Sequence, residues 1–193
     1  MATSFNIVDG IEKIYYAVLD EKNEQYGEVK LFSDMVVEFG MSPTQNSTSV
    51  YGSNREITSI LGNLTGEVTL TVQSLDEEVQ AEVMGKVKAE GGGYLDKGLD
   101  KPYVALMVEK SLDGGEYEYL TLYKGKFDLA EEKAKTKEDQ AEAQAQSYTA
   151  RFIQLKDKTF KYAVRTTSME EDEKTAFMEK WGKQVIKPAV AQE

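Results

Sequence analysis

Residues 102–127 read PYVALMVEKSLDGGEYEYLTLYKGKF, and this stretch predicts the β-hairpin on which the fold is built. Asp-Gly between two apolar runs is a strong signal for a tight turn between antiparallel strands, and Asp113-Gly114-Gly115 stands at that point. The run after the turn alternates in character, so that one face carries Tyr117, Tyr119, Thr121 and Tyr123. A period of two is the signature of a strand, and the hairpin therefore predicts antiparallel β-structure.

Strands are predicted along most of the remaining chain as well. The segments concerned are rich in Ile, Val and Tyr or alternate in polarity, which suits a pleated surface. They cover residues 11–20, 28–39 and 65–73, together with a second hairpin formed by residues 147–155 and 159–166. We therefore expect a mainly β fold of the α+β class.

Two segments predict helices. Residues 74–88 begin with a Ser-x-x-Glu capping pattern at Ser74 and carry apolar side chains on one stripe. The three glycines at 91–93 are expected to end this helix. A short helix near the C-terminus begins with the same pattern at Ser168 and ends at Gly182.

The chain predicts one domain over residues 1–182, because no Pro/Ser-rich linker divides it and no internal repeat is present. Two polar segments, 40–56 and 131–146, are expected to be long loops. Loops longer than about 12 residues in a compact domain are usually functional. Residues 183–193 are expected to form a flexible C-terminal arm.

Composition excludes most catalytic chemistry. The 193 residues contain no cysteine and no histidine, which removes thiolate sites, Ser-His-Asp triads and histidine-based metal sites. Phosphate-binding glycine motifs and EF-hand loops are absent from the sequence. We therefore predict that the protein is not an enzyme, with no catalytic, metal or cofactor-binding residue and no cofactor.

The net charge of −11 argues against binding to nucleic acid or anionic membranes. The N-terminus has no basic region followed by an apolar run, and no segment approaches the ~20 apolar residues that a membrane helix needs. These features predict a soluble protein that is made in the cytoplasm and has no membrane partner.

Several segments, in this order, resemble the major tail (tail tube) protein of long-tailed, non-contractile phages. They are GIEKIYYAVLDEKNEQYG (10–27), SPTQNSTSVYGSNR (42–55), SLDEEVQAEVMG (74–85), PYVALMVEKS (102–111), YEYLTLYKGKFDLAEEKAKTKED (117–139) and SYTARFIQLKDKTFKYAV (147–164). The most specific piece is residues 122–137, where the order of lysines, glycine and acids is not required by a generic strand. The resemblance covers about residues 8–182.

The resemblance implies a β-sandwich or half-barrel of two packed antiparallel sheets with a flanking helix. It further implies homohexameric rings, whose sheets join into one inner barrel and which stack into the virion's tail tube. Double-stranded DNA would pass through this tube into the host without specific binding. The tape-measure protein and tail-end proteins would be partners, and the chain would be made in the bacterial host cytoplasm.

We expect the two polar loops to contact neighbouring subunits or rings. The candidate contact residues are Pro43, Gln45, Asn46, Tyr51 and Arg55 in the first loop, and Lys133, Lys135 and Lys137 in the second. An alternative function remains open on sequence grounds. It is a monomeric β-sandwich module that binds carbohydrate or a cell surface through the tyrosines of residues 117–123.

Overall fold

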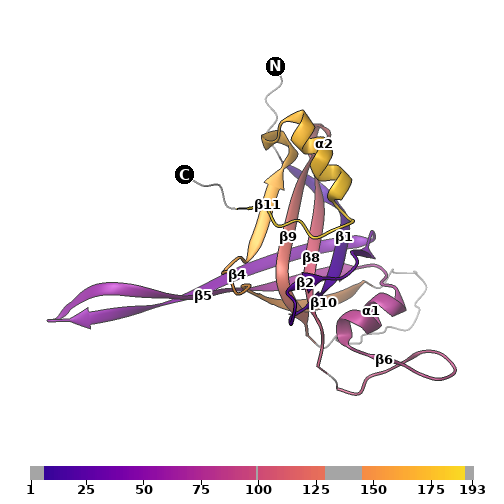
Figure 1. Ribbon diagram of the computed structural model, residues 1–193, viewed down its shortest axis with the longest axis horizontal. Helices are drawn as coiled ribbons and strands as arrows, with labels where there is room; N and C mark the ends of the chain where they lie inside the picture. The colour runs from indigo at the N-terminus through magenta and orange to yellow at the C-terminus, as the bar shows by residue number, and fades with distance from the viewer. Residues whose placement is uncertain (1–6, 99, 129–144, 190–193) are drawn as a thin grey trace, which may run out of the picture.

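The computed structural model describes residues 7–98, 100–128 and 145–189, and it is built mainly of antiparallel strands (Figure 1). The strands are β1 (Val8–Asp20), β2 (Gln25–Tyr26), β3 (Lys30–Ser33), β4 (Val36–Gly52), β5 (Arg55–Val72), β6 (Val87–Lys88), β7 (Tyr94–Leu95), β8 (Tyr103–Leu112), β9 (Glu116–Phe127), β10 (Gln146–Ile153) and β11 (Lys161–Arg165). The α-helices are α1 (Glu77–Met84) and α2 (Glu171–Lys180), and short 3₁₀ turns occupy Asp113–Gly115 and Thr166–Ser168.

Nine strands form one antiparallel sheet in the order β2-β1-β8-β9-β10-β5-β4, with β3 beside β1 and β11 beside β9. The predicted central hairpin is present as β8 and β9, joined at Asp113–Gly115. β9 divides the sheet, because it pairs with β11 through residues 118–122 and with β10 through residues 125–127. β6 and β7 form a separate small ribbon. The mainly β architecture confirms the prediction from the sequence and is consistent with the β-sandwich that the family resemblance implies.

The first core lies on one face of the sheet, beneath α1. The helix buries Ala81, Val83 and Met84, and Phe32 stands at the centre of an aromatic group. Its ring stacks on Phe127 with centroids 5.4 Å apart. Alternate residues of β5, β8, β9 and β10 complete this core, among them Leu70, Leu106, Leu122 and Phe152.

A second core lies on the opposite face, where α2 and the residues after it cover β8 and β9 (Figure 1). The ring of Trp181 lies 4.6 Å from that of Tyr119 and 5.6 Å from that of Phe177. Tyr123 is also buried, and its hydroxyl donates a 2.9 Å hydrogen bond to the Ile186 carbonyl. The tyrosine face of β9 is therefore part of a core.

Glu109 contacts this second core and makes it sensitive to pH. The indole Nε1 of Trp181 donates a 3.1 Å hydrogen bond to the Glu109 carboxylate. Burial is the main reason that the pKa of Glu109 is raised above its ordinary value of 4.5. An acid with a raised folded-state pKa binds more protons in the folded than in the unfolded chain, so stability falls as the pH rises above about 4.5.

We expect Glu109→Gln to raise the free energy of unfolding modestly at pH 7. The amide oxygen of glutamine still accepts the hydrogen bond from Trp181, and the substitution removes the buried negative charge. At pH 4 the variant and the wild type should be nearly equal, since the unfolded chain is then largely protonated too. Denaturant titration followed by the fluorescence of the single tryptophan measures both values. A gain that is larger at pH 4 than at pH 7 would contradict this account.

The helices differ from the sequence expectation at their ends. α1 is shorter than residues 74–88, and its N-cap is Asp76, whose carboxylate accepts hydrogen bonds from the backbone of Glu78 and Val79. Gly85, with a φ of 67°, ends it well before the three glycines at 91–93. α2 begins after Glu170 without a side-chain cap, so the pattern predicted at Ser168 does not form the cap.

Two other expectations were wrong in detail. Residues 40–56 are not a loop, because β4 and β5 continue through them and turn only at Ser53 and Asn54. β10 and β11 do not form a paired hairpin: β10 lies between β5 and β9, whereas β11 pairs with β9. The segment between them makes only a tight turn, in which the Leu155 amide donates a hydrogen bond to the Thr159 carbonyl.

Residues 183–189 belong to the segment expected to be a free arm, and the structure places them on the body. Val185 and Ile186 pack against the second core. The Lys187 ammonium lies 2.5 Å from the Asp157 carboxylate. Hydrogen bonds from Lys187 and from Thr159 lower the pKa of Asp157 to about 2.

Candidate functional site: an assembly surface

β4 and β5 extend beyond the rest of the sheet as a two-stranded arm, which we define as residues 45–63 (Figure 1). β10 pairs with β5 only from Thr65 onward, so the ladders of the described chain pair the arm strands with each other alone. The turn residues Ser53 and Asn54 have φ values of 51° and 61°, as a two-residue type I′ turn requires. At about 3.3 Å per residue, the arm reaches roughly 30 Å from the body.

Three of the predicted contact residues lie at or near the base of the arm. Pro43 is opposite Gly66, and β4 tolerates proline there because it is an edge strand of the described sheet. Gln45 donates a 3.0 Å hydrogen bond from Nε2 to the Gly62 carbonyl, which ties the two strands together. Asn46 lies where the register between the strands shifts.

The other two predicted residues of this segment lie at the tip. Arg55 begins β5 opposite Gly52, and Tyr51 is opposite Glu56. The Tyr51 side chain is 70% exposed, which is unusual for a large aromatic residue unless it meets a partner. The arm thus brings Tyr51 and Arg55 together, about 30 Å from Pro43.

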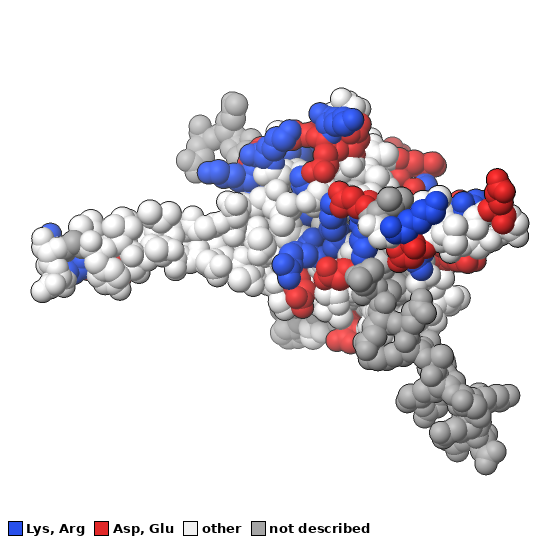
Figure 2. Space-filling model, turned by 90° about the horizontal axis from the view of Figure 1, so that it is seen from below, with Lys and Arg blue, Asp and Glu red and all other residues white. Residues whose placement is uncertain are grey.

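The arm is almost free of charge. Between Glu38 and Glu67 the only charged residues are Arg55 and Glu56, although 30% of the whole chain is charged. Figure 2 shows the consequence, since the arm is nearly white while the body is covered in red and blue. A segment fully exposed to water normally carries more charge than this, so the composition indicates a surface that becomes buried.

Apolar side chains stand on the arm without cover from the body. They are between 37% and 70% exposed, and they are Val50, Tyr51, Ile57, Ile60 and Leu61. Within the arm, sequence reasoning named residues of β4 and Arg55 at the start of β5, and it missed the apolar residues of β5. Their signal was present, because residues 57–64 read ITSILGNL between two polar segments.

The body of the sheet carries a second distinctive surface, the open polar face. Cross-strand neighbours on β10 and β5 pair Arg151 with Glu67, Thr149 with Thr69 and Ser147 with Thr71. The neighbouring positions of β4 are Glu38, Gly40 and Ser42. This face is polar throughout, while the other face of the same strands packs in the first core.

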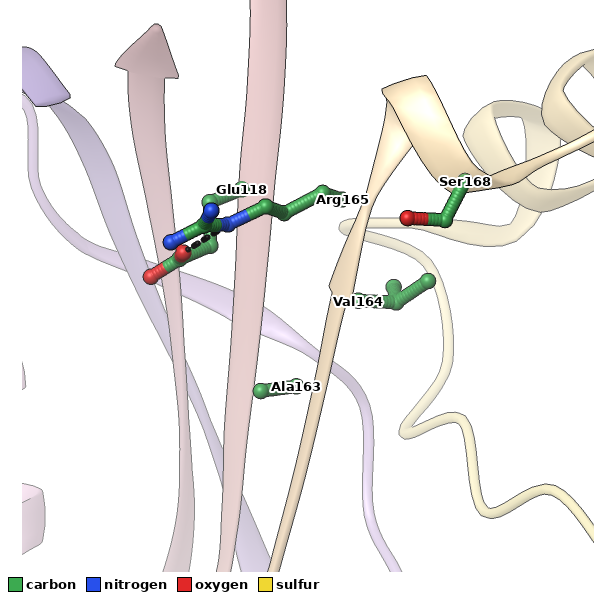
Figure 3. Close-up of a pocket in the computed structure, with 5 residues that line it drawn as sticks. All are labelled: Glu118, Ala163, Val164, Arg165 and Ser168. Carbon is green, nitrogen blue, oxygen red and sulfur yellow. Dashed lines mark hydrogen bonds and ion pairs between the residues drawn. The ribbon is translucent and has the colours of Figure 1, made fainter. Parts of the chain in front are cut away.

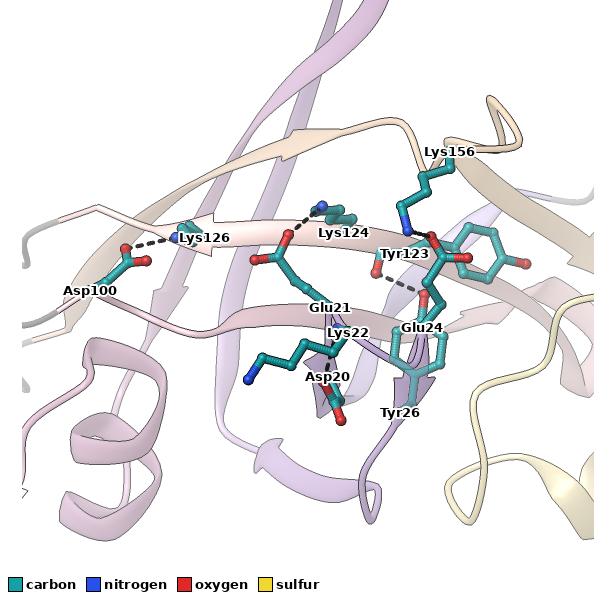
Figure 4. Close-up of polar contacts among 10 residues, drawn as sticks. All are labelled: Asp20, Glu21, Lys22, Glu24, Tyr26, Asp100, Tyr123, Lys124, Lys126 and Lys156. Atoms are coloured by element: carbon teal, nitrogen blue, oxygen red, sulfur yellow. Dashed lines mark hydrogen bonds and ion pairs between the residues drawn. The ribbon is translucent and has the colours of Figure 1, made fainter.

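A cluster of ion pairs lies where the β1–β2 turn and the segment before β8 meet β9 (Figure 4). Lys124 is 2.7 Å from Glu21, and Lys126 is 2.7 Å from Asp100. Both ammonium groups also lie over the Tyr103 ring, 4.3 Å and 4.2 Å from its centroid. Each of these two lysines has an acidic partner, so the cluster fastens loops to the sheet rather than presenting free cations.

A pocket beside β11 is lined by Glu118, Ala163, Val164, Arg165 and Ser168 (Figure 3). The Glu118 carboxylate is fully engaged, at 2.7 Å from Arg165 and 3.0 Å from Lys110. Burial raises the pKa of Glu118, but the hydrogen bonds from these two cations outweigh it and the pKa is lowered. An ionised, doubly paired carboxylate is a poor general base.

Within residues 7–98, 100–128 and 145–189, no group of three or more acidic, histidine or cysteine residues is placed to hold a metal ion. In that same part of the chain, no helix has the length and apolar character needed to span a membrane. The predicted contact residues Lys133, Lys135 and Lys137 lie outside the described residues. The tyrosines of the alternative binding module are accounted for by the second core, and nothing supports that alternative.

Comparison with known proteins identifies the family. A search of the curated proteins found no match. The model of the phage tail tube protein family matches residues 43–187, which include the outer part of β4, the strands β5 to β11 and both helices. Because the match covers well over half of the sequence, the chain belongs to the phage tail tube protein family and is a structural component of the virion tail.

Proposed function

We propose that this chain forms closed rings of six copies, which stack into the tube through which the phage genome leaves the capsid. The observation that carries the proposal is the arm, an uncharged and partly apolar ribbon that the body leaves uncovered. An isolated two-stranded hairpin is marginally stable in water, so the arm gains from a partner surface. Another copy of the chain supplies that surface in a tube.

The free edge of β4 supports closure of the ring. β4 ends the strand order of the described sheet and offers a run of unpaired backbone groups along Val36–Gly52. Exposed edges of this length template pairing with another chain. A rotational arrangement in which each copy adds its sheet to the next covers these edges and closes into a barrel.

The open polar face suits the wall of a water-filled channel. Its hydroxyl side chains offer DNA no apolar or cationic surface of any size. Arg151, the basic residue of this face, is opposite Glu67, and its other neighbour, Lys126 of β9, is paired with Asp100. A chain of net charge −11 repels phosphate over a screening length of ~8 Å at physiological salt, so DNA passes without being held.

The contact residues follow from this arrangement. Tyr51 and Arg55 at the tip, with Pro43, Gln45 and Asn46 at the base, contact a neighbouring subunit or ring. We retain the same role for Lys133, Lys135 and Lys137 as a prediction from the sequence. The tube needs no catalytic group, and its further partners are the tape-measure protein and the proteins at the tail ends.

Electron microscopy of the purified full-length chain tests this function. We expect rings or hollow tubes in negative stain, with light scattering that increases with protein concentration. The same sample in high salt should assemble at lower concentration, because salt screens the repulsion between copies of net charge −11. A monomer at every concentration and salt level, with a retained glycan, would instead identify a binding module.

A further inference from the structure

The large sheet branches at one point of β9. β11 pairs with residues 118–122 of β9, and β10 pairs with residues 125–127. Tyr123 and Lys124 lie between the two pairings, at the place where the ladder between β9 and β8 also shifts its register. A register shift of this kind bends a strand and increases its twist. The angle between β11 and β10 therefore depends on how this branch point is held.

Tyr123 is held at the branch point by three segments that are distant in sequence. Its amide donates a 3.4 Å hydrogen bond to the Phe160 carbonyl, just before β11. Its carbonyl accepts a 3.0 Å hydrogen bond from the Tyr26 hydroxyl of β2 (Figure 4), and its hydroxyl donates to the Ile186 carbonyl at 2.9 Å. Burial is the main reason that the pKa of Tyr123 is raised above its ordinary value of 10, so the hydroxyl remains a donor.

The residues after α2 form a strap, which we define as residues 182–187, and the strap extends across the branch point. Val185 and Ile186 pack against the second core, and beyond them the Lys187 ammonium pairs with the Asp157 carboxylate. Asp157 lies in the turn between β10 and β11, which is the covalent connection between the two branches. The strap therefore fastens this turn to the body of the sheet.

The same turn is fastened on two other sides. The Lys156 ammonium lies 2.8 Å from the Glu24 carboxylate of the β1–β2 turn (Figure 4). The Gln154 side chain accepts a 2.9 Å hydrogen bond from the Leu64 amide of β5 and donates one of 2.8 Å to the Lys158 carbonyl. Contacts from both branches, from the β1–β2 turn and from the strap thus meet at one place.

We propose that Tyr123 and the strap set the angle between β11 and β10, and that this angle determines how many copies close a ring. This inference rests on the proposed function, in which the edge of β4 joins the next copy. β4 is carried by β10 and β5, so its direction relative to the body sets the rotation from one copy to the next. A closed ring requires the same rotation at every copy. Tyr123 is a positioning residue, because it is buried within its own chain and acts on the ring through the sheet.

Distance measurements in the free chain test the angle directly. The chain has no native cysteine, so Ala163→Cys on β11 and Thr69→Cys on β5 place two spin labels at exposed positions of the two branches. In this labelled chain, Tyr123→Phe keeps the ring and removes the hydroxyl, and it should shift or broaden the distance distribution in pulsed electron paramagnetic resonance. Tyr16→Phe is the matched control, because it removes a buried hydroxyl that is bonded to Glu82 in the first core. It should leave the distribution unchanged.

Electron microscopy of the assembled chain tests the consequence for the ring. Loss of one buried hydrogen bond shifts an equilibrium by about fivefold. In Tyr123→Phe, the ratio of closed rings of wild-type diameter to all other assemblies should fall by about that factor, whereas Tyr16→Phe should give wild-type rings.

A second pair of variants avoids the core altogether. Lys187→Gln opens the ion pair of the strap at an exposed position, and it should change the distance distribution and the rings in the same direction as Tyr123→Phe. Lys183→Gln makes the same change of charge elsewhere on the strap and should leave both unchanged.

The outcomes separate this inference from the function beneath it. Wild-type distances in Tyr123→Phe, or equal changes in Tyr16→Phe, overturn the role of Tyr123. Altered distances with wild-type rings overturn the link between the branch angle and ring size. A wild-type chain that forms no ring contradicts the proposed function, and the distances in the free chain then still decide whether Tyr123 sets the angle.

Discussion

Replacing residues 46–63 by a two-residue Asn-Gly turn is expected to abolish tube formation while leaving the free chain folded. Gln45 and Leu64 are partners in the ladder and flank the new turn, and Asn-Gly is the preferred sequence for a two-residue hairpin connection. The deletion removes no residue of either core. Circular dichroism and thermal unfolding check the fold, and electron microscopy checks assembly.

The control for this deletion keeps the arm and improves its turn. Ser53→Asn with Asn54→Gly provides the residues that best tolerate the observed positive φ values of 51° and 61°. This double variant should form tubes at least as readily as the wild type. Tubes from the shortened chain would show that contacts of the body alone are sufficient for assembly.

Gly125→Val is expected to produce the largest loss of stability among single substitutions on the sheet. A Cβ atom at Gly125 would lie 2.5–2.6 Å from three atoms of the Phe152 ring, which is fully buried. Phe152 is opposite Gly125 in the ladder between β10 and β9, and its ring fills the space of the side chain that Gly125 lacks. Overpacking of this kind costs about 3 kcal/mol.

For a chain of this length, a loss of about 3 kcal/mol lowers the Tm by roughly 6–12 °C. Gly40→Ala is the control, because Gly40 lies in β4 of the same sheet and its added Cβ meets nothing closer than 4.0 Å. That variant should change the free energy of unfolding by less than about 0.5 kcal/mol. An equal loss of unfolding free energy in the two variants would mean that replacing a strand glycine is itself destabilising, and that the contact with the Phe152 ring is not the cause.

The central hairpin is predictable from sequence because local signals and tertiary structure agree there. The turn at Asp113–Gly115 and the alternation along β9 correctly separate the tyrosine face from the leucine face. The α1 boundaries were less predictable, since Asp76 competes with Ser74 as N-cap and only the fold selects between them. The family resemblance is confirmed independently by the match over residues 43–187.

The arm could not be predicted as a hairpin, for a physical reason. Its first strand begins QNSTS and lacks the apolar alternation that marks a half-buried strand. The body of the same chain leaves this strand uncovered. Its turn is Ser-Asn rather than Asn-Gly or Asp-Gly. A segment whose burial depends on other copies carries the pattern of its interface, and this pattern resembles that of a loop.

The pairing of β10 was missed for a related reason. Residues 147–166 look like a local hairpin because two strands flank a turn, yet each strand joins a partner that is distant in sequence. Long-range pairing of this kind is set by the two cores, which bury Phe152 on one side and contact Tyr162 on the other. The short distance in sequence between β10 and β11 therefore does not reveal their true partners.

The solitary ribbon also has a kinetic consequence. A hairpin that is marginally stable by itself becomes well ordered only when it packs against another surface. In the tube that we propose, the first copies find no assembled surface to receive the arm, whereas each later copy adds to a surface that already exists. Growth should therefore show a lag that short tube fragments abolish, and a phage can keep its subunits waiting until an initiator arrives, without any inhibitor.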